Sequence, residues 1–231
     1  MVAQHHEDTP GAVWFREPQR RRKTPALNRD RIIRAAVDRL DRDGIEGLSL
    51  RKIAADLDVH ATSLYWHVAT KGDLLDLALD EVFAEIALPD APSSVDWTDV
   101  LLAYMRQLRA MLLRHPWAGS LASTRPLAGP HALARSESVY AALDEAGLEG
   151  DALAAAAAAV SNLAIATAST QAAWARQPEA ASREALHQRI ARERDRYPTL
   201  AKHLESHLDG WDSQFEITAR TFVEGLEARY R

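Results

Sequence analysis

The amino-acid sequence predicts an all-α protein, and three observations support that prediction. Apolar residues recur three and four positions apart through most of the 231 residues, which is the spacing of one face of a helix. No segment alternates apolar and polar residues over the length of a strand, and no repeat of solenoid length occurs. The length permits one or two domains, each large enough to be stabilised by its own hydrophobic core.

The composition favours an intracellular protein. The absence of cysteine excludes a disulfide framework, a thiolate zinc site and a cysteine nucleophile, and it fits a reducing compartment. The longest apolar stretch, residues 152–165, is mostly alanine and is interrupted by Ser161 and Asn162, so we expect it to fall short of a membrane span. The N-terminus has no apolar signal-peptide core. We therefore expect a cytoplasmic protein that does not bind a membrane.

The charges are unevenly distributed along the chain. A net charge of −5 argues by itself against a nucleic-acid partner, but residues 16–71 hold thirteen Lys and Arg against eight Asp and Glu. Residues 72–231 hold fifteen against twenty-three. This pattern indicates that the first third meets a polyanion. Residues 1–26, which include the basic run 20–23, are interpreted as a flexible basic arm, the alternative being a solvated tail without function.

Three helices are predicted directly after the arm, over residues 28–44, 49–58 and 62–68. Asn28 can cap the first, Ser49 the second, and either Thr62 or Ser63 the third. Helices as short as the last two are marginal alone and must be held by mutual packing. Two short helices joined by a tight turn and supported by a longer preceding one form a helix-turn-helix.

The rest of the chain is also predicted to be helical. A fourth helix is expected from Lys71 or Asp73 to Ile86, and prolines and serines mark a boundary at residues 88–95. Six consecutive alanines, Ala154–Ala159, let a second backbone approach closely, so we interpret them as a subunit interface or tight bundle; compositional drift is the alternative. The later helices are expected at residues 97–114, 131–145, 151–176, 183–196 and 212–230.

The third helix has the chemistry of a helix that reads DNA. Leu64 and Val68 are four residues apart and can pack inward, which leaves the other side chains largely outward. Small residues at the front admit the helix to the major groove, and hydroxyl, indole and imidazole groups can bond bases or phosphates. The alternative is that Tyr65, Trp66 and His67 are buried in a small core. The outward-facing residues are Ala61, Thr62, Ser63, Tyr65, Trp66 and His67.

Three basic side chains flank this helix. Arg51 and Lys52 lie in the first turn of the preceding helix and are long enough to reach the groove, where an arginine can bond guanine through two hydrogen bonds. Lys71 lies at the start of the fourth helix, where the helix dipole disfavours a cation unless a phosphate is near. We therefore expect all three to contact DNA.

The motifs "GIEGLSLRKIA" and "LYWHV", followed by Lys71, make residues 27–82 resemble the DNA-binding domain of the TetR family of transcriptional repressors. The resemblance implies a homodimer that binds a palindromic double-stranded operator through domains at residues 27–87 and is released by a small-molecule effector bound at residues 96–231. Some members activate transcription instead. The family's DNA-contacting positions fall on Ser49, Arg51, Ala61, Thr62, Ser63, Tyr65, Trp66, His67 and Lys71.

The N-terminal arm resembles extensions found in some family members. A basic arm of this kind can enter the minor groove beside a recognition helix. We treat a contact between residues 1–24 and DNA as a hypothesis.

A weaker resemblance continues through residues 112–129, where Thr124, Arg125 and Pro126 match a motif that implies an effector-pocket edge. In tetracycline-binding members, histidines that contact magnesium or the drug fall on Leu121 and Ala87 here. We therefore do not expect magnesium–tetracycline as the effector. Each pocket candidate has plain core packing as its alternative. The candidate ligand-binding residues are Phe83, Tyr104, Leu108, Leu121, Thr124, Arg125, Pro126, Asn162 and Trp174.

Rival functions have weaker support. Ser49 and Lys52 match the S-x-x-K spacing of a serine enzyme, but a serine there is also a helix cap. His203, Glu205 and His207 could begin a metal site, although no third ligand on the same helix face is evident. A purely structural dimer module would not need a basic first third. We expect no catalytic residue, metal or cofactor.

Overall fold

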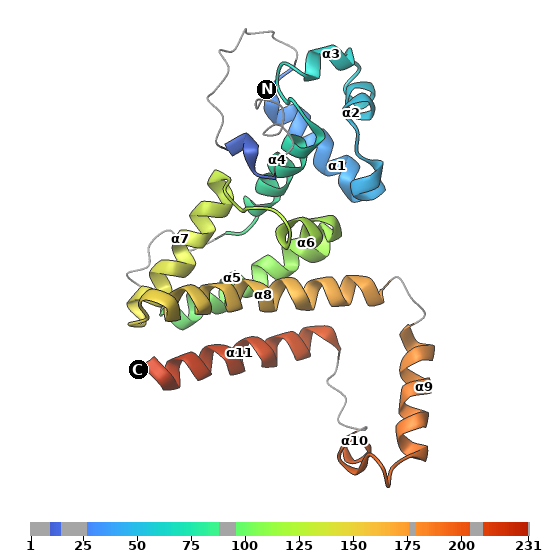
Figure 1. Cartoon of the computed structure of the whole chain (residues 1–231), viewed down its shortest axis with the longest axis vertical. Coiled ribbons are helices and arrows are strands. Elements are labelled where there is room, and N and C mark those ends of the chain that lie inside the picture. The colour runs from blue at the N-terminus through green and yellow to red at the C-terminus, as the bar shows by residue number, and fades with distance from the viewer. Residues whose placement is uncertain (1–9, 15–26, 88–95, 176–178, 204–209, 231) are drawn as a thin grey trace, which may run out of the picture.

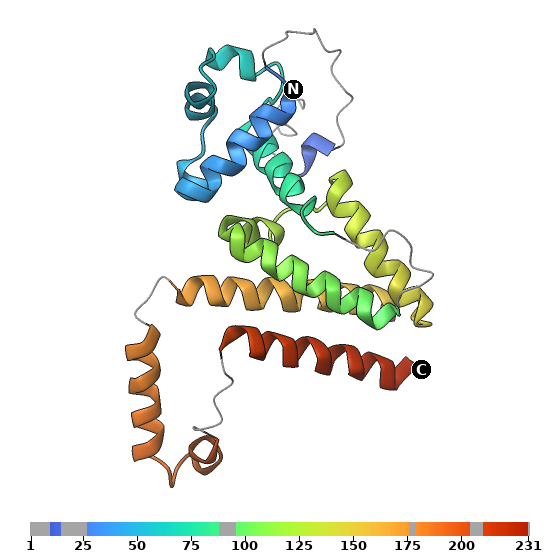
Figure 2. The same cartoon turned by 180° about the vertical axis from the view of Figure 1, so that it is seen from behind.

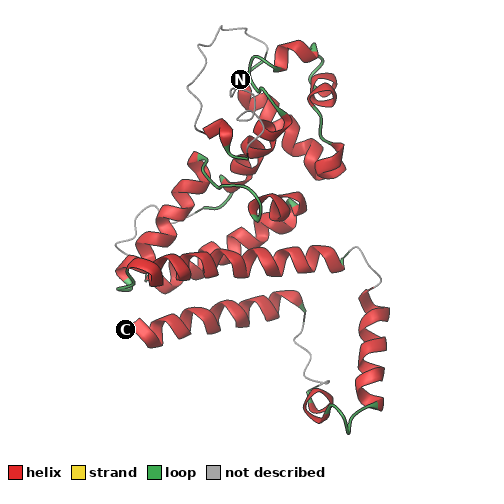
Figure 3. Cartoon of the chain, in the orientation of Figure 1, coloured by secondary structure: helices red, strands yellow, loops and turns green. Residues whose placement is uncertain are grey.

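The computed structural model describes residues 10–14, 27–87, 96–175, 179–203 and 210–230, and these form helices joined by loops and turns (Figures 1 and 3). The all-α prediction is confirmed for this part of the chain. The elements are a 3-10 helix η1 (Ala12–Trp14) and the α-helices α1 (Arg29–Gly47), α2 (Leu50–Asp56), α3 (Ala61–Leu64), α4 (Lys71–Phe83), α5 (Trp97–Arg114), α6 (Pro116–Ala122), α7 (Pro130–Glu145), α8 (Gly150–Trp174), α9 (Glu179–Arg192), α10 (Pro198–Lys202) and α11 (Trp211–Tyr230).

Helix α1 begins where the sequence predicts and bends where the predicted helix ends. The side chain of Asn28 accepts a hydrogen bond from the backbone N–H of Arg31 at 2.8 Å, so Asn28 is the expected N-cap. Gly44 has a φ of 68°, which an L side chain adopts only with strain. The chain therefore kinks at Gly44 before a last turn to Gly47.

Helices α2 and α3 form the predicted helix-turn-helix, but α3 is shorter than expected. Ser49 caps α2 by accepting from the N–H of Lys52 at 3.3 Å. The prediction that Thr62 or Ser63 caps α3 is wrong, because the N-cap is His60, whose side chain makes no capping bond. The carbonyl of Leu64 accepts from the N–H groups of both His67 and Val68, so the chain tightens into turns after Leu64.

Helix α4 connects the two halves of the molecule. It packs on α1 in the N-terminal unit and on α6 and α7 in the C-terminal unit (Figures 1 and 2). Because both units cover it, its three aspartates Asp73, Asp76 and Asp80 are buried along with its apolar residues. A buried carboxylate is stable only with hydrogen-bond or ionic partners. The contacts that these aspartates make therefore show where the two units are held together.

The C-terminal helices confirm the predicted order with two additions. Helices α5, α7, α8 and α11 lie within a few residues of the predicted ranges, and α9 begins earlier than its prediction. Helices α6 and α10 were not predicted. Each is short and begins with a proline, Pro116 or Pro198, which is favourable at a first helical position but leaves little periodicity to detect.

Helix α8 corrects one expectation. It has 25 residues and a mean hydropathy of 1.6 over an 18-residue window, so by length and composition alone it could cross a membrane. The expectation that this stretch falls short of a span was therefore wrong. In the described chain one side of α8 packs against α5, α6, α7 and α11, and 28% of the apolar window is buried.

Part of the N-terminal arm is docked on the protein. Residues 10–14 lie beside α4, where the backbone N–H of Gly11 donates to the Asp76 carboxylate at 2.7 Å (Figure 1). Val13 and Trp14 are half-buried against the main core. Residues 1–9 and 15–26, which include the basic run, lie outside the described part of the chain.

We expect Leu64→Ala to lower the free energy of unfolding by about 2–5 kcal/mol, because the side chain has no exposed surface and its removal leaves a cavity. The neighbouring Tyr65→Ala is the matched control and should change stability by about 0.5 kcal/mol or less, since Tyr65 is largely exposed. Urea denaturation measures both values. Equal losses in the two variants would contradict the described packing of α3.

Candidate DNA interface and domain junction

The conspicuous aromatic residues after α3 face solvent. Tyr65 is 55% exposed and Trp66 is 80% exposed, whereas Leu64 and Val68 on either side are buried. The alternative that these aromatic residues belong to a small core is therefore wrong. Large exposed aromatic rings with polar tips are unusual on a free surface and indicate a contact surface. His67 is half-buried, so its exposure is intermediate between that of the two aromatic residues and that of Leu64 and Val68.

The other predicted DNA-contacting residues lie on or beside the same unit. Thr62, Arg51 and Lys52 are exposed, while Ala61 and Ser63 are half-buried at the front of α3. The Lys52 ammonium donates to the carbonyl of Gly47 at 3.1 Å, and Ser49 is occupied as the cap of α2. Ser49 and Lys52 therefore stabilise the start of α2 and its connection to α1, and they do not form a serine–lysine site.

Lys71 has a partner that sequence reasoning did not find. Its ammonium donates to the carbonyl of Ile45, 2.8 Å away in the last turn of α1. The expectation that this cation needs a nearby phosphate is therefore corrected, because a carbonyl at the C-terminal end of α1 already stabilises it. Lys71 consequently ties α4 to α1.

An ion-pair cluster braces α2 against α1. The guanidinium of Arg39 donates to both carboxylate oxygens of Asp56 and to Asp43 at 2.6 Å. The hydrogen bond from Arg39 holds the pKa of Asp43 below its ordinary value. Asp56 is the last residue of α2, so Arg39 fixes the orientation of the segment that leads into α3.

Arg125 forms the first junction between the two halves of the chain. Its guanidinium donates to Asp76 at 2.5 Å and to the carbonyl of Gly72 at 3.2 Å, both on α4. The Asp76 side chain is almost fully buried, and Arg125 is half-buried over it. The adjacent Thr124 and Pro126 are exposed, so of this predicted trio Arg125 makes the buried contact to α4.

His115 forms a second junction that was not predicted. Its two ring nitrogens lie 2.7 Å from Asp41 on α1 and 3.0 Å from Glu85, in the turn that follows α4. The indole N–H of Trp117 also donates to Asp41, at 2.6 Å. The histidine and tryptophan of the segment "HPW" could have drawn attention, but their partners lie 30 to 76 residues away. A cleft of about 1270 Å³ between the end of α1, α6 and the end of α8 borders this corner.

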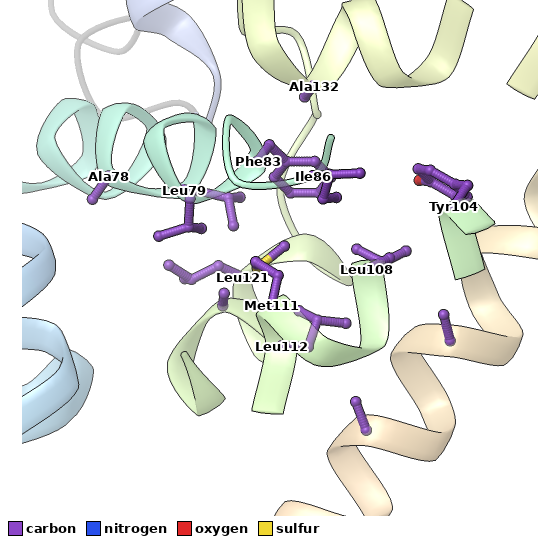
Figure 4. Packing of buried hydrophobic residues seen from close by; sticks show 14 of the residues in the cluster. Ala78, Leu79, Phe83, Ile86, Tyr104, Leu108, Met111, Leu112, Leu121 and Ala132 are labelled. Carbon is purple, nitrogen blue, oxygen red and sulfur yellow. The ribbon is translucent and has the colours of Figure 1, made fainter. Parts of the chain in front are cut away.

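Four of the predicted effector-binding residues lie in one buried cluster. Phe83, Tyr104, Leu108 and Leu121 come together from α4, α5 and α6, and Figure 4 shows them beside Ile86 and Met111. The Tyr104 hydroxyl lies 3.3 Å from that of Ser161, and burial raises the pKa of this phenol. Tyr104 is therefore a neutral polar group in an otherwise apolar core.

Two further candidates do not join this cluster. Asn162 is exposed on α8, and Trp174 is exposed at the end of that helix. No group of three or more His, Cys, Asp or Glu side chains suited to a metal ion occurs in the described residues. Glu205 and His207 of the hypothetical metal site lie outside the residues that the structure describes.

This arrangement defines a class of protein. A braced helix-turn-helix with an exposed recognition segment is joined through polar contacts to a larger helical domain, as in one-component transcriptional regulators. Family models agree with this division: "Bacterial regulatory proteins, tetR family" matches residues 32–78, and "Tetracyclin repressor-like, C-terminal domain" matches residues 88–230.

Comparison with known proteins places the chain in a family. It is 52% identical over 223 residues to an HTH-type transcriptional regulator of Saccharopolyspora erythraea, covering 96% of this chain and 94% of that protein. It is 40% identical over 133 residues to the HTH-type transcriptional repressor DrrR1 of Streptomyces coeruleorubidus, covering 58% of this chain and 49% of the repressor. The chain belongs to the TetR family of bacterial transcriptional regulators.

Solved structures of the family share the fold of most of the chain. The structure of ActR from Streptomyces coelicolor in complex with actinorhodin matches with a TM-score of 0.80 at 28% identity, covering 90% of this chain and 98% of ActR. A second structure of ActR, in complex with (S)-DNPA, matches with a TM-score of 0.76 at 29% identity, covering 89% of this chain and 99% of that one.

Arg125→Met should lower the free energy of unfolding by about 3–5 kcal/mol, because it removes the guanidinium that compensates a buried carboxylate. Arg220→Met is the matched control, since Arg220 pairs with Glu216 four residues earlier on the surface of α11 and should contribute less than about 1 kcal/mol. Chemical denaturation at fixed pH and salt compares them. A cost for Arg125→Met no larger than that of the control would show that the Asp76 contact does not hold the junction.

Proposed function

We propose that this protein is a ligand-responsive transcriptional repressor that binds a palindromic operator as a homodimer and is released by a small-molecule inducer. The observation that carries the proposal is the exposed pair Tyr65 and Trp66, held outward by the buried Leu64 and Val68. Membership of the TetR family and the resemblance to a named repressor, DrrR1, support the same function.

The proposed DNA contacts divide into two kinds. Tyr65, Trp66 and His67 present hydroxyl, indole and imidazole groups that suit phosphate oxygens, which fix position but carry little sequence information. Arg51, Thr62 and Ser63, with the small Ala61, lie where base edges are read in the major groove. The specificity of this protein therefore depends more on the second set than on the aromatic residues.

The proposed dimer uses the long helices α8 and α11. They lie side by side along one edge of the molecule in both views, and together they have the geometry of half of a four-helix bundle (Figures 1 and 2). Ala154, Ala155 and Ala158 on α8 are exposed, and so is Ile217 on α11. Small exposed residues permit close backbone approach, which favours a second copy of this chain as the partner.

The proposed effector is a small molecule bound in the C-terminal domain. ActR, with the same fold, has been solved in complex with actinorhodin and with (S)-DNPA. The buried cluster around Tyr104 and Leu108 is one proposed location. Leu121 and Ala87 cannot ligate a metal, so magnesium–tetracycline is not the proposed effector. Neither a catalytic role nor a cofactor belongs to this function, which we place in the cytoplasm.

Selection from random-sequence DNA by the full-length protein tests the central claim. We expect an inverted repeat with half-sites one helical turn apart, bound at physiological salt with a dissociation constant of about 10⁻⁸ M or lower. A reporter gene driven through the selected site then gives the sign of regulation: repression supports the proposal, and activation would replace it with the activator role. No preference over competitor DNA would reject both.

Arg51→Ala and Trp66→Ala should affect operator binding in different ways. Losing Arg51 should cost about 1–3 kcal/mol on the selected site and relax selection at one position of each half-site. Losing Trp66 should weaken binding to all sequences by a similar factor, because it removes a backbone contact. Competition binding with matched and mutated sites measures both, with unfolding midpoints as the folding control. Identical effects of the two variants would refute the division of roles.

A further inference from the structure

Arg109 on α5 is a buried charge in the acidic part of the chain. Only 8% of the residue is exposed, and residues 72–231 hold fifteen basic residues against twenty-three acidic ones. Its Nε–H finds no hydrogen-bond partner among the described residues. A buried cation with an unused donor is costly, and a function that employs the donor would account for its presence.

One of the two hydrogen-bond partners of Arg109 is exposed and can be exchanged for a ligand. Its Nη2 donates to the side chain of Gln171 and to Asp212, the latter at 2.7 Å. The Asp212 side chain is 87% exposed, so this carboxylate can turn into water at little cost. The guanidinium carbon also lies 4.9 Å from the centre of the Phe215 ring, which holds the group in place.

A cavity of about 190 Å³ opens beside this arginine, between α5, α8 and α11. Two threonines and a glutamine line it together with a tryptophan and a phenylalanine, so it combines polar side chains with flat apolar walls. An apolar cavity of about 150 Å³ admits a benzene ring. The cavity beside Arg109 therefore has room for one ring and part of a second. Its walls include Thr167, Thr170, Trp211, Gln214 and Phe215.

We propose that this cavity binds a flat aromatic anion, with Arg109 as the group that binds its carboxylate or phenolate. The Nε–H and Nη2–H of a guanidinium match two oxygens of one carboxylate. Thr170 and Gln214 complete the polar side, and the rings of Trp211 and Phe215 border the aromatic body. Ligand binding displaces Asp212 from Arg109. The site is distinct from the cluster around Tyr104, and its regulatory meaning rests on the proposed ligand-responsive function.

A nearby ion pair on the same helices provides the matched control. Arg106, one turn before Arg109 on α5, donates to Glu216 on α11, so it also joins these two helices. Its side chain is 40% exposed and does not line the cavity. A purely structural role for Arg109 predicts that both arginines behave alike toward a ligand.

The test titrates the full-length protein with 2-naphthoate and with the uncharged 2-naphthamide by isothermal titration calorimetry. We expect naphthoate to bind at least about tenfold more tightly than naphthamide. Arg109→Gln should reduce this preference to nearly none, because the charge-assisted hydrogen bond to the carboxylate is lost. Arg106→Gln should leave both affinities unchanged. Asp212→Asn should tighten naphthoate binding several-fold, since it removes the competing carboxylate while retaining Arg109.

Several outcomes would overturn the proposal: no saturable binding of naphthoate, equal affinity for the two probes, or equal effects of Arg109→Gln and Arg106→Gln. Unchanged naphthoate affinity in Asp212→Asn would also contradict it, and this variant keeps the test valid if Arg109→Gln fails to fold. Operator binding is measured separately in the same protein samples without probe. An absence of sequence preference in the operator-binding measurement rejects the proposed function. The naphthoate titration alone tests whether the cavity beside Arg109 binds an aromatic anion.

Discussion

The buried carboxylates of α4 are the constraint on which the arrangement of the two halves depends. Asp76 accepts from the guanidinium of Arg125 and from the N–H of Gly11, and a buried carboxylate left without such partners would be strongly destabilising. Asp80, one turn later, accepts from the N–H groups of His131 and Ala132 at 3.3 and 2.8 Å. It thus caps α7 from another helix, in place of a capping side chain at Gly129.

The close approach of Asp80 also explains Gly129. A Cβ at this position would lie 2.2 Å from the carboxyl carbon of Asp80, closer than real atoms approach. The C-terminal domain is therefore fixed to α4 at two successive turns. Since α4 begins only a few residues after the recognition segment, its orientation in turn sets the position of α3.

How far the sequence predicts this molecule depends on the distance between partners along the chain. The caps at Asn28 and Ser49, and the inward positions of Leu64 and Val68, depend on neighbours within four residues and were predicted correctly. The sequence also predicted that Tyr65 and Trp66 face outward, and both are exposed.

The contacts that join the two halves could not be predicted in the same way. The Arg125–Asp76 pair spans 49 residues and the His115–Asp41 pair spans 74, so only the folded chain brings them together. Lys71 illustrates the same limit, because its partner Ile45 lies 26 residues earlier. The predicted pocket candidates divide for a related reason: Tyr104 and Leu108 face the core, whereas periodicity alone could not place Asn162 on the exposed face of α8.

Helix α5 provides a physical route between the two halves. Its last residue, Arg114, pairs with Glu85 at 2.8 Å, and the following His115 contacts Glu85 and Asp41. Arg109 lies six residues before His115, about 9 Å along the helix at 1.5 Å per residue. A helix is stiff over this distance, so a ligand that replaced Asp212 at Arg109 and shifted α5 would also alter the contacts to α1 and to the end of α4. Regulation then requires that these contacts differ in free energy between the DNA-binding and released states, since a ligand shifts an equilibrium only by its difference in affinity for the two.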